Sequence, residues 1–213
     1  MTRIGVLGSG DVGKTLASGL KAHGYDVRIG SRTGGKLDGF TATSGIPNDD
    51  FAKVAEWAEG LVLAVAGRGA LEALEESGRD NLAGKWIMDV TNPIELSAPE
   101  DGVLRYFTGP NESLMERLQD AVPHAHFVKA FSSVGHARMV NPVYTGGTPT
   151  MFYCGNDAAA KHAVAKIIVE FGWEDCDMGT AKAARAIEPL CMLWCIPGFR
   201  DHSWTHAFKL LRG

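Results

Sequence analysis

The first 36 residues constrain the fold most, because an apolar strand runs directly into a glycine-rich turn and then a helix. The turn reads Gly8-Ser-Gly-Asp-Val-Gly13. This spacing between a strand and a helix is typical of the dinucleotide-binding βαβ unit. Gly8 permits the tight turn, Gly10 lets the backbone approach a pyrophosphate, and Gly13 lets helix and strand pack closely. We therefore predict a Rossmann-type α/β fold that binds a dinucleotide at the start of a helix over 12–23.

The end of the second predicted strand, 26–29, indicates which dinucleotide is bound. An acidic side chain at this place would bond the ribose 2′-hydroxyl of NAD. Here Ser31 and Arg32 follow the strand, Lys36 comes shortly after, and Asp26 stands at the wrong end. A hydroxyl, a guanidinium and an ammonium suit a phosphate dianion. The pattern predicts NADP(H); the alternative is a glycine-rich turn in an unrelated α/β protein with solvated basic residues.

Composition excludes several other classes of protein. The 213 residues are 45% hydrophobic and 22% charged, with a net charge of −4 and no block of lysine or arginine, so we expect no nucleic-acid partner. The longest apolar stretch, 187–199, contains Glu188 and two prolines and is too short to cross a bilayer. Because no signal peptide precedes the first strand and the four cysteines lack C-x-x-C spacing, we expect a cytoplasmic protein with reduced, mostly buried cysteines.

Strands and helices alternate along the chain, which predicts a doubly wound, mainly parallel sheet with helices on both faces. Segment 33–47 is irregular, so its crossover helix is expected to be short or absent. We place a boundary near residue 140, between an NADP-binding Rossmann domain (1–140) and a small α/β cap (141–213) packed on the same sheet. Further strands are expected at 61–65, 86–90, 126–131, 150–154 and 173–176. Further helices are expected at 50–59 (capped by Asn48 or Asp49), 69–77, 113–121, 158–171 (capped by Asn156-Asp157) and 181–194, the last closing at Pro197-Gly198.

Nine short motifs occur in a specific order and spacing. They are Gly8–Gly13, Gly30-Ser-Arg32, Asp89-Val-Thr-Asn-Pro93, Val128-Lys-Ala-Phe131, Met139-Val-Asn-Pro142, Cys154-Gly-Asn-Asp157, Asp177-Met-Gly179, Ala184–Glu188 and Ala207–Arg212. Through them the chain resembles, over essentially its whole length, the NADPH-dependent reductases of deazaflavin coenzyme F-420. It is also similar to the cytosolic reductase domain of the six-transmembrane metalloreductases, which are relatives of that family.

The resemblance implies how the cofactor is held. Ser31, Arg32 and Lys36 would bind the 2′-phosphate, and the backbone of 9–12 would bind the pyrophosphate. The turn after the fourth strand would contact the nicotinamide-side ribose, together with the neighbouring loop at 92–93. The expected cofactor-binding residues are Gly8, Ser9, Gly10, Asp11, Val12, Gly13, Ser31, Arg32, Lys36, Ala64, Val65, Ala66, Asn92 and Pro93.

The segment after the sixth strand, 131–136, would form the floor under the second ring system. Deazaflavin-binding members carry a His-Thr-Ile-Pro-type sequence there, whereas this chain does not. The expected partner is therefore a small hydride acceptor, with coenzyme F-420 and a flavin (FMN or FAD) both open. The expected substrate-binding residues are Ser132, Ser133, Val134, Gly135 and His136.

Hydride transfer between a nicotinamide and a flavin-type ring needs no covalent nucleophile, because the two cofactors carry the chemistry. We recognise no Lys/Asp or Ser-Tyr-Lys constellation near the sheet edge and name no catalytic residue. His136 could protonate an imine or a ketone, since its unperturbed pKa lies near neutrality; alternatively it is a surface residue at a helix start. Reduction of a small carbonyl or imine, and a non-catalytic NADP(H) sensor, remain as alternative functions.

Two pairs with helical spacing, Cys191/Cys195 and His202/His206, could in principle bind zinc. Neither has a third ligand nearby, so core packing is the preferred interpretation and no metal site is predicted. Arg185 is expected to pair with Glu188 on the same helix. Three aromatic residues near the C-terminus, Trp194, Phe199 and Trp204, would line either an acceptor pocket or a subunit interface. An apolar terminal helix on a small cap favours the interface, so we expect a homodimer.

Overall fold

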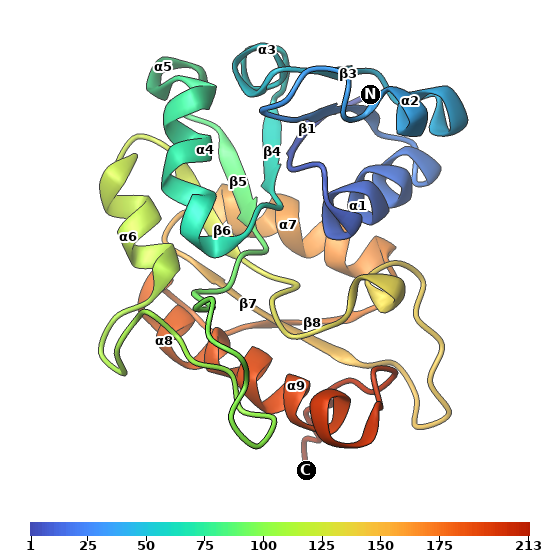
Figure 1. Cartoon of the computed structure of the whole chain (residues 1–213), viewed down its shortest axis with the longest axis vertical. Helices are drawn as coiled ribbons and strands as arrows, with labels where there is room; N and C mark the ends of the chain where they lie inside the picture. The colour runs from blue at the N-terminus through green and yellow to red at the C-terminus, as the bar shows by residue number, and fades with distance from the viewer.

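The computed structural model describes all 213 residues as an eight-stranded sheet flanked by helices (Figure 1). The strand order is β3-β2-β1-β4-β5-β6-β7-β8, and all neighbouring strands are parallel except β6 and β7. The strands are β1 (Arg3–Leu7), β2 (Asp26–Gly30), β3 (Asn48–Asp49), β4 (Gly60–Leu63), β5 (Trp86–Asp89), β6 (His126–Lys129), β7 (Thr150–Gly155) and β8 (Glu174–Asp177).

Helices cover both faces of this sheet, which confirms the predicted fold class. The α-helices are α1 (Asp11–Ala22), α2 (Asp38–Ser44), α3 (Phe51–Trp57), α4 (Ala70–Ser77), α5 (Arg79–Leu82), α6 (Leu114–Ala121), α7 (Ala158–Glu170), α8 (Ala184–Ile187) and α9 (Pro189–Asp201), and three 3-10 turns are η1 (Gly67–Gly69), η2 (His136–Arg138) and η3 (Ala181–Ala183). One core lies under α1 and α7 and includes Leu16 and Val164. The other lies under α3, α4 and α6 and includes Val54 and Leu118.

The predicted short crossover helix is present as the seven-residue α2. The predicted cap of the next helix is wrong, because Asp50 caps α3 by accepting a hydrogen bond from the Lys53 amide. Asn48 and Asp49 instead pair with the end of β2 as the small strand β3. The cap therefore falls on the first residue beyond that strand.

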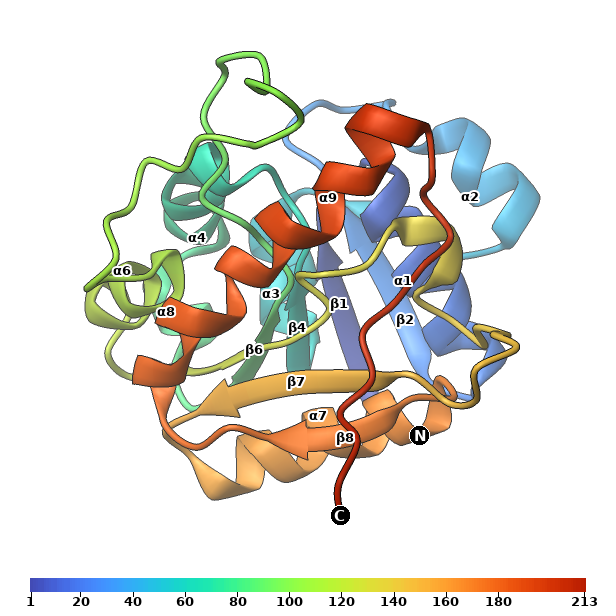
Figure 2. The same ribbon diagram turned by 90° about the horizontal axis from the view of Figure 1, so that it is seen from below.

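The residues after 140 extend the same sheet, because β7 pairs with β6 and β8 with β7; the domain division at this point stays a prediction. Helix α9 then crosses in front of the carboxyl ends of the strands (Figure 2). Its predicted end at Pro197-Gly198 is wrong, since it continues through Pro197 to Asp201. Gly198 lies directly under the Trp204 ring, where an added Cβ would be 2.3 Å away, and this packing stabilises the additional turn. No helix combines the length and apolar character needed to cross a membrane.

Candidate functional site

The glycine-rich turn after β1 lies where the predicted dinucleotide site requires it. A Cβ on Gly8 would meet the Ala64 carbonyl oxygen at 2.1 Å, and Gly8 also has a φ of +143° that side chains rarely adopt. A Cβ on Gly13 would meet the Gly8 carbonyl oxygen at 2.2 Å. A Cβ on Gly10 would have no atom within 4 Å. Gly8 and Gly13 thus permit close backbone packing, whereas Gly10 leaves open space at the N-terminus of α1, which attracts anions.

A pocket of about 230 Å³ opens over this turn. It brings together residues from the ends of β1, β2 and β4, which is the expected place for a ligand in this type of sheet. Eight of its ten lining residues were expected to bind the cofactor; Thr33 and Phe51 were not, and no local signal marks them. The lining residues are Gly8, Ser9, Gly10, Arg32, Thr33, Lys36, Phe51, Ala64, Val65 and Ala66.

The basic corner of this pocket contains Arg32 and Lys36, as predicted for a 2′-phosphate site. Lys36 makes no ion pair, whereas Arg32 pairs with Glu72 of α4, a contact that the sequence does not indicate. Ser31 is buried and its hydroxyl donates to the Thr33 carbonyl, so Thr33 lines the pocket in its place. The guanidinium that would bind the phosphate is therefore already engaged by a carboxylate.

We expect Glu72→Gln to tighten NADPH binding. Both side chains of the Arg32–Glu72 pair are about half exposed, and such pairs contribute at most about 1 kcal/mol. Removing this competitor should therefore lower the Kd for NADPH by roughly two- to fivefold and leave NADH, which lacks the phosphate, unchanged. Fluorescence titration measures both constants. Glu76→Gln removes the same charge from α4 outside this pair, and an equal effect of both variants would contradict the assignment.

The loops after β4, β5 and β6 meet beyond the pocket, where the nicotinamide half was expected. A Cβ on Gly67 would lie 2.0 Å from the Asn92 carbonyl oxygen, so only a glycine lets these two loops touch. The Asn92 side-chain amide donates to the Ser132 carbonyl at 2.8 Å. The Asn92 Oδ1 and the Ser132 hydroxyl are buried without a hydrogen-bond partner, and such groups are rare in folded proteins.

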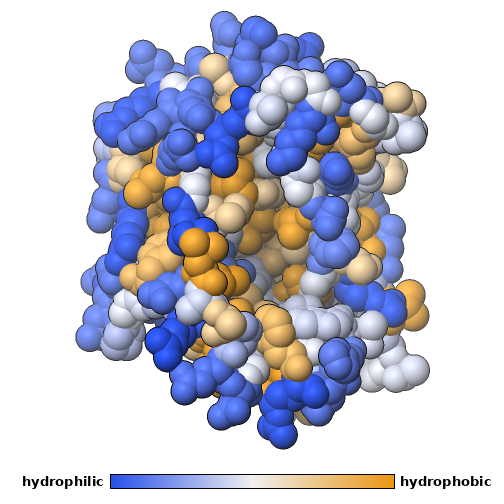
Figure 3. Space-filling view, in the orientation of Figure 1, coloured by the Kyte–Doolittle hydropathy of each residue, from blue (hydrophilic) through white to orange (hydrophobic).

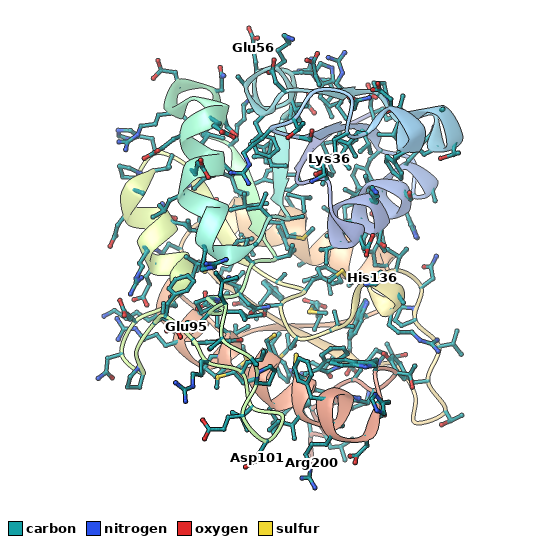
Figure 4. The ribbon with its side chains drawn as sticks, viewed as in Figure 1. Lys36, Glu56, Glu95, Asp101, His136 and Arg200 are labelled. Atoms are coloured by element: carbon teal, nitrogen blue, oxygen red, sulfur yellow. The ribbon has the colours of Figure 1, made fainter.

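The expected acceptor segment 131–136 is held from several sides. It leaves β6 through Phe131, whose φ of 55° is unusual for an aromatic residue. Val134 is buried, and Gly135 packs so closely on the Trp194 ring that a Cβ would lie 2.9 Å from it. His136 is exposed at the start of η2, as the alternative interpretation held (Figure 4). Figure 3 shows a hollow in this face, with apolar side chains inside it and polar ones around it.

A buried charged cluster, composed of Asp89, Lys129 and Glu188, lies at the carboxyl ends of β5 and β6. The Lys129 ammonium is 2.7 Å from Asp89 and 3.0 Å from Glu188. Burial by itself lowers the pKa of Lys129, but the two carboxylates outweigh burial and leave the pKa raised, so the amine stays charged. The expectation of no Lys/Asp pair at this edge was wrong. The sequence feature that could have predicted this cluster is Lys129 itself, because a lysine within an apolar, buried strand needs a partner of opposite charge.

The predicted pairing of Arg185 with Glu188 is also wrong. Arg185 bonds Glu116 of α6 through two guanidinium nitrogens, at 2.9 and 2.7 Å. This bidentate pair lowers the pKa of the Glu116 carboxyl. Glu188 points the other way, into the core, because Lys129 and the first amides of α6 are there.

The paired cysteines and histidines near the C-terminus do not form one cluster. Cys191 and Cys195 are buried with their sulfur atoms 4.0 Å apart, in agreement with core packing. His202 caps the end of α9 and the chain is not helical beyond it, so His202 and His206 do not share a helix face. His206 stacks on Trp194 and bonds its carbonyl oxygen instead. No three metal-ligating side chains converge.

The chain is similar to known proteins in both sequence and structure. Residues 3–93 match the family described as coenzyme F420-dependent NADP oxidoreductase. Metalloreductase STEAP3 of Rattus norvegicus is 30% identical over 200 residues, which are 92% of this chain but 38% of the relative, so the chain spans well under half of that protein.

Two solved structures are similar to this chain over at least 94% of its length. A protein of Arthrobacter sp. FB24, assigned by its name to the F420-dependent NADP-reductases, superposes with a TM-score of 0.93 and 32% identity, and each chain is covered completely. An imine reductase of Streptomyces aurantiacus has a TM-score of 0.66 and 16% identity over 94% of this chain and 64% of the other. The second likeness shows a shared fold alone.

Proposed function

Since this chain belongs to the family of coenzyme F420-dependent NADP oxidoreductases, we propose that it transfers a hydride between NADP(H) and a flavin-type ring, either coenzyme F420 or a flavin. It is an NADP-dependent oxidoreductase; the identity of the acceptor is our proposal. The observation that carries the proposed use of NADP(H) is the pocket over the glycine turn. This pocket joins the open space at Gly10 to the basic corner at Arg32 and Lys36.

The residues present fit NADP(H) both in the pocket and in the loops that meet beyond it. The unpaired amides at the start of α1 would bind the pyrophosphate, and Arg32 and Lys36 would bind the 2′-phosphate. The buried, unpartnered oxygen atoms of Asn92 and Ser132 fit a polar group at the nicotinamide end. When bound, the nicotinamide supplies or accepts the hydride.

The protein's own contribution is to position the two rings and to exclude water. The segment 131–136 is fixed by the αL conformation of Phe131, by the Asn92 amide and by the Trp194 ring, which supports its role as the floor under the acceptor. The hollow that Figure 3 shows in this face of the molecule, with apolar side chains inside it, suits an aromatic ring system. This arrangement needs no side chain that bonds covalently to the substrate.

The experiment is NADPH oxidation by the purified protein, with coenzyme F420, FMN and a cyclic imine offered in parallel. We expect turnover with at least one of the two ring acceptors. Reduction of the imine alone, abolished in His136→Ala, would replace this proposal by the small-substrate function, since the exposed His136 could supply the proton. Tight NADPH binding without turnover of any acceptor would instead support a sensor.

A further inference from the structure

The cluster of Asp89, Lys129 and Glu188 is more completely buried than any other group of charges in the chain. The exposed fractions of Asp89 and Lys129 are 0%, and that of Glu188 is 1%. The Lys129 ammonium donates a hydrogen bond to the Thr91 carbonyl oxygen at 2.7 Å and forms ion pairs with Asp89 at 2.7 Å and with Glu188 at 3.0 Å. The cluster is therefore an ordered network that contains one cation and two carboxylates.

The remaining carboxylate oxygens also have defined partners. Asp89 Oδ1 accepts from the amide and the hydroxyl of Thr91, at 2.9 and 2.6 Å. The two Glu188 oxygens accept from the amides of Leu114 and Met115, at the start of α6. Apolar residues at such places often stabilise a protein as well as a buried ion network does. Stability alone is therefore a poor explanation for three buried charges here.

The network connects directly to the loops that would bind the two rings. Lys129 bonds the Thr91 carbonyl, and the next residue, Asn92, bonds the Ser132 carbonyl. Ser132 in turn follows Lys129 closely along the chain, with the strained Phe131 between them. Backbone strain of this kind persists only where the surroundings enforce it, and it concentrates at functional sites.

A second connection runs through the C-terminal helices. Glu188 lies between α8 and α9, and its carboxylate ties this junction to Lys129 on the sheet. Helix α9 carries Trp194, which presses against Gly135 in the acceptor segment. The position of Glu188 therefore sets how α9 is placed against that segment.

We propose that the Asp89–Lys129–Glu188 cluster positions Asn92 and the segment 132–136 for hydride transfer, without touching either reactant. This inference rests on the proposed function. Lys129 and Glu188 are positioning residues, because both side chains are buried and neither is among the residues that line the pocket over the glycine turn. The cluster thus couples the nicotinamide side, through Thr91, to the acceptor side, through α9.

The test compares Glu188→Gln with the wild-type protein, using whichever acceptor the wild type turns over. Glutamine keeps the shape and one accepting oxygen but removes the charge that Lys129 requires. We expect kcat to fall at least tenfold while the Kd for NADPH changes less than twofold, since the phosphate-binding residues lie in the segments that follow β1 and β2. The emission maximum of bound NADPH, which reports on the nicotinamide environment, should shift even though the Kd does not.

Glu116→Gln is the matched control, because the Glu116–Arg185 pair also joins α6 to α8 but is partly exposed. If the cluster merely tied helices together, Glu188→Gln and Glu116→Gln would both lower the unfolding midpoint, and the kcat of Glu188→Gln would equal that of Glu116→Gln. The triple variant Asp89→Asn, Lys129→Met, Glu188→Gln has no buried charge in the cluster, so it can be tested even if Glu188→Gln alone fails to fold. We expect it to fold, bind NADPH and stay slow; wild-type kcat in the folded triple variant would overturn the proposal. Failure of the proposed function is distinct, because the wild type would then turn over neither ring acceptor.

Discussion

Gly8→Ala is expected to destabilise the protein, whereas Gly10→Ala is expected to weaken NADPH binding without destabilising it. Gly8 has a φ reserved for glycine and faces the Ala64 backbone, so alanine there should lower the free energy of unfolding by about 3 kcal/mol. Gly10 has an ordinary φ of −80° and open space around its Cβ position. Its alanine variant should unfold within about 0.5 kcal/mol of the wild type but bind NADPH on the order of tenfold more weakly, because the methyl group occupies the approach to the pyrophosphate.

Urea denaturation and fluorescence titration of both variants measure the two effects separately. Gly34→Ala is a suitable control, since Gly34 also has open space around its Cβ position but lies outside the pocket lining. Unchanged NADPH affinity in Gly10→Ala would place the pyrophosphate elsewhere. A fully stable Gly8→Ala protein would contradict the close approach of the turn to β4.

Arg32→Ala should reduce the affinity for NADPH far more than that for NADH. The lost charge-assisted hydrogen bond to the 2′-phosphate corresponds to about 1–3 kcal/mol, or roughly 5- to 150-fold in Kd. The effect on folding should be small, because Arg32 is half exposed and its partner Glu72 can be solvated. Titration with both nucleotides gives the ratio directly.

Arg28→Ala provides the control, because Arg28 lies on β2 shortly before Arg32 and its guanidinium stacks on Trp57 outside the pocket. Raising the salt concentration should weaken NADPH binding in the wild type more than in Arg32→Ala, since the wild type has two cations, Arg32 and Lys36, at the 2′-phosphate and the variant has one. Equal losses for NADPH and NADH in Arg32→Ala would refute the 2′-phosphate assignment. Lys36→Ala should then be tested for the same role.

Much of the fold follows from local pattern. The apolar runs of β1, β4 and β5 and the alternation with helices predict a parallel sheet, because buried parallel strands need apolar side chains on both faces. The small strand β3 and the extra turn of α9 could not be predicted. Two residues in β3 have too little pattern to indicate a strand, and the turn beyond Pro197 depends on Trp204 packing on Gly198.

The sequence by itself determined the parallel sheet, through the alternation of apolar strands with helices along the chain. It also determined the glycine turn and the basic pair of the cofactor pocket, because those residues lie within 36 positions and their spacing carries the geometry. The tertiary structure alone decided that Glu72 engages Arg32, that Asn92 reaches Ser132, and that Glu188 turns from Arg185 to Lys129. These contacts join residues far apart in the chain. Which charges meet depends on which strand ends and helix ends become neighbours, and on whether water is excluded there; neither property is contained in local sequence spacing.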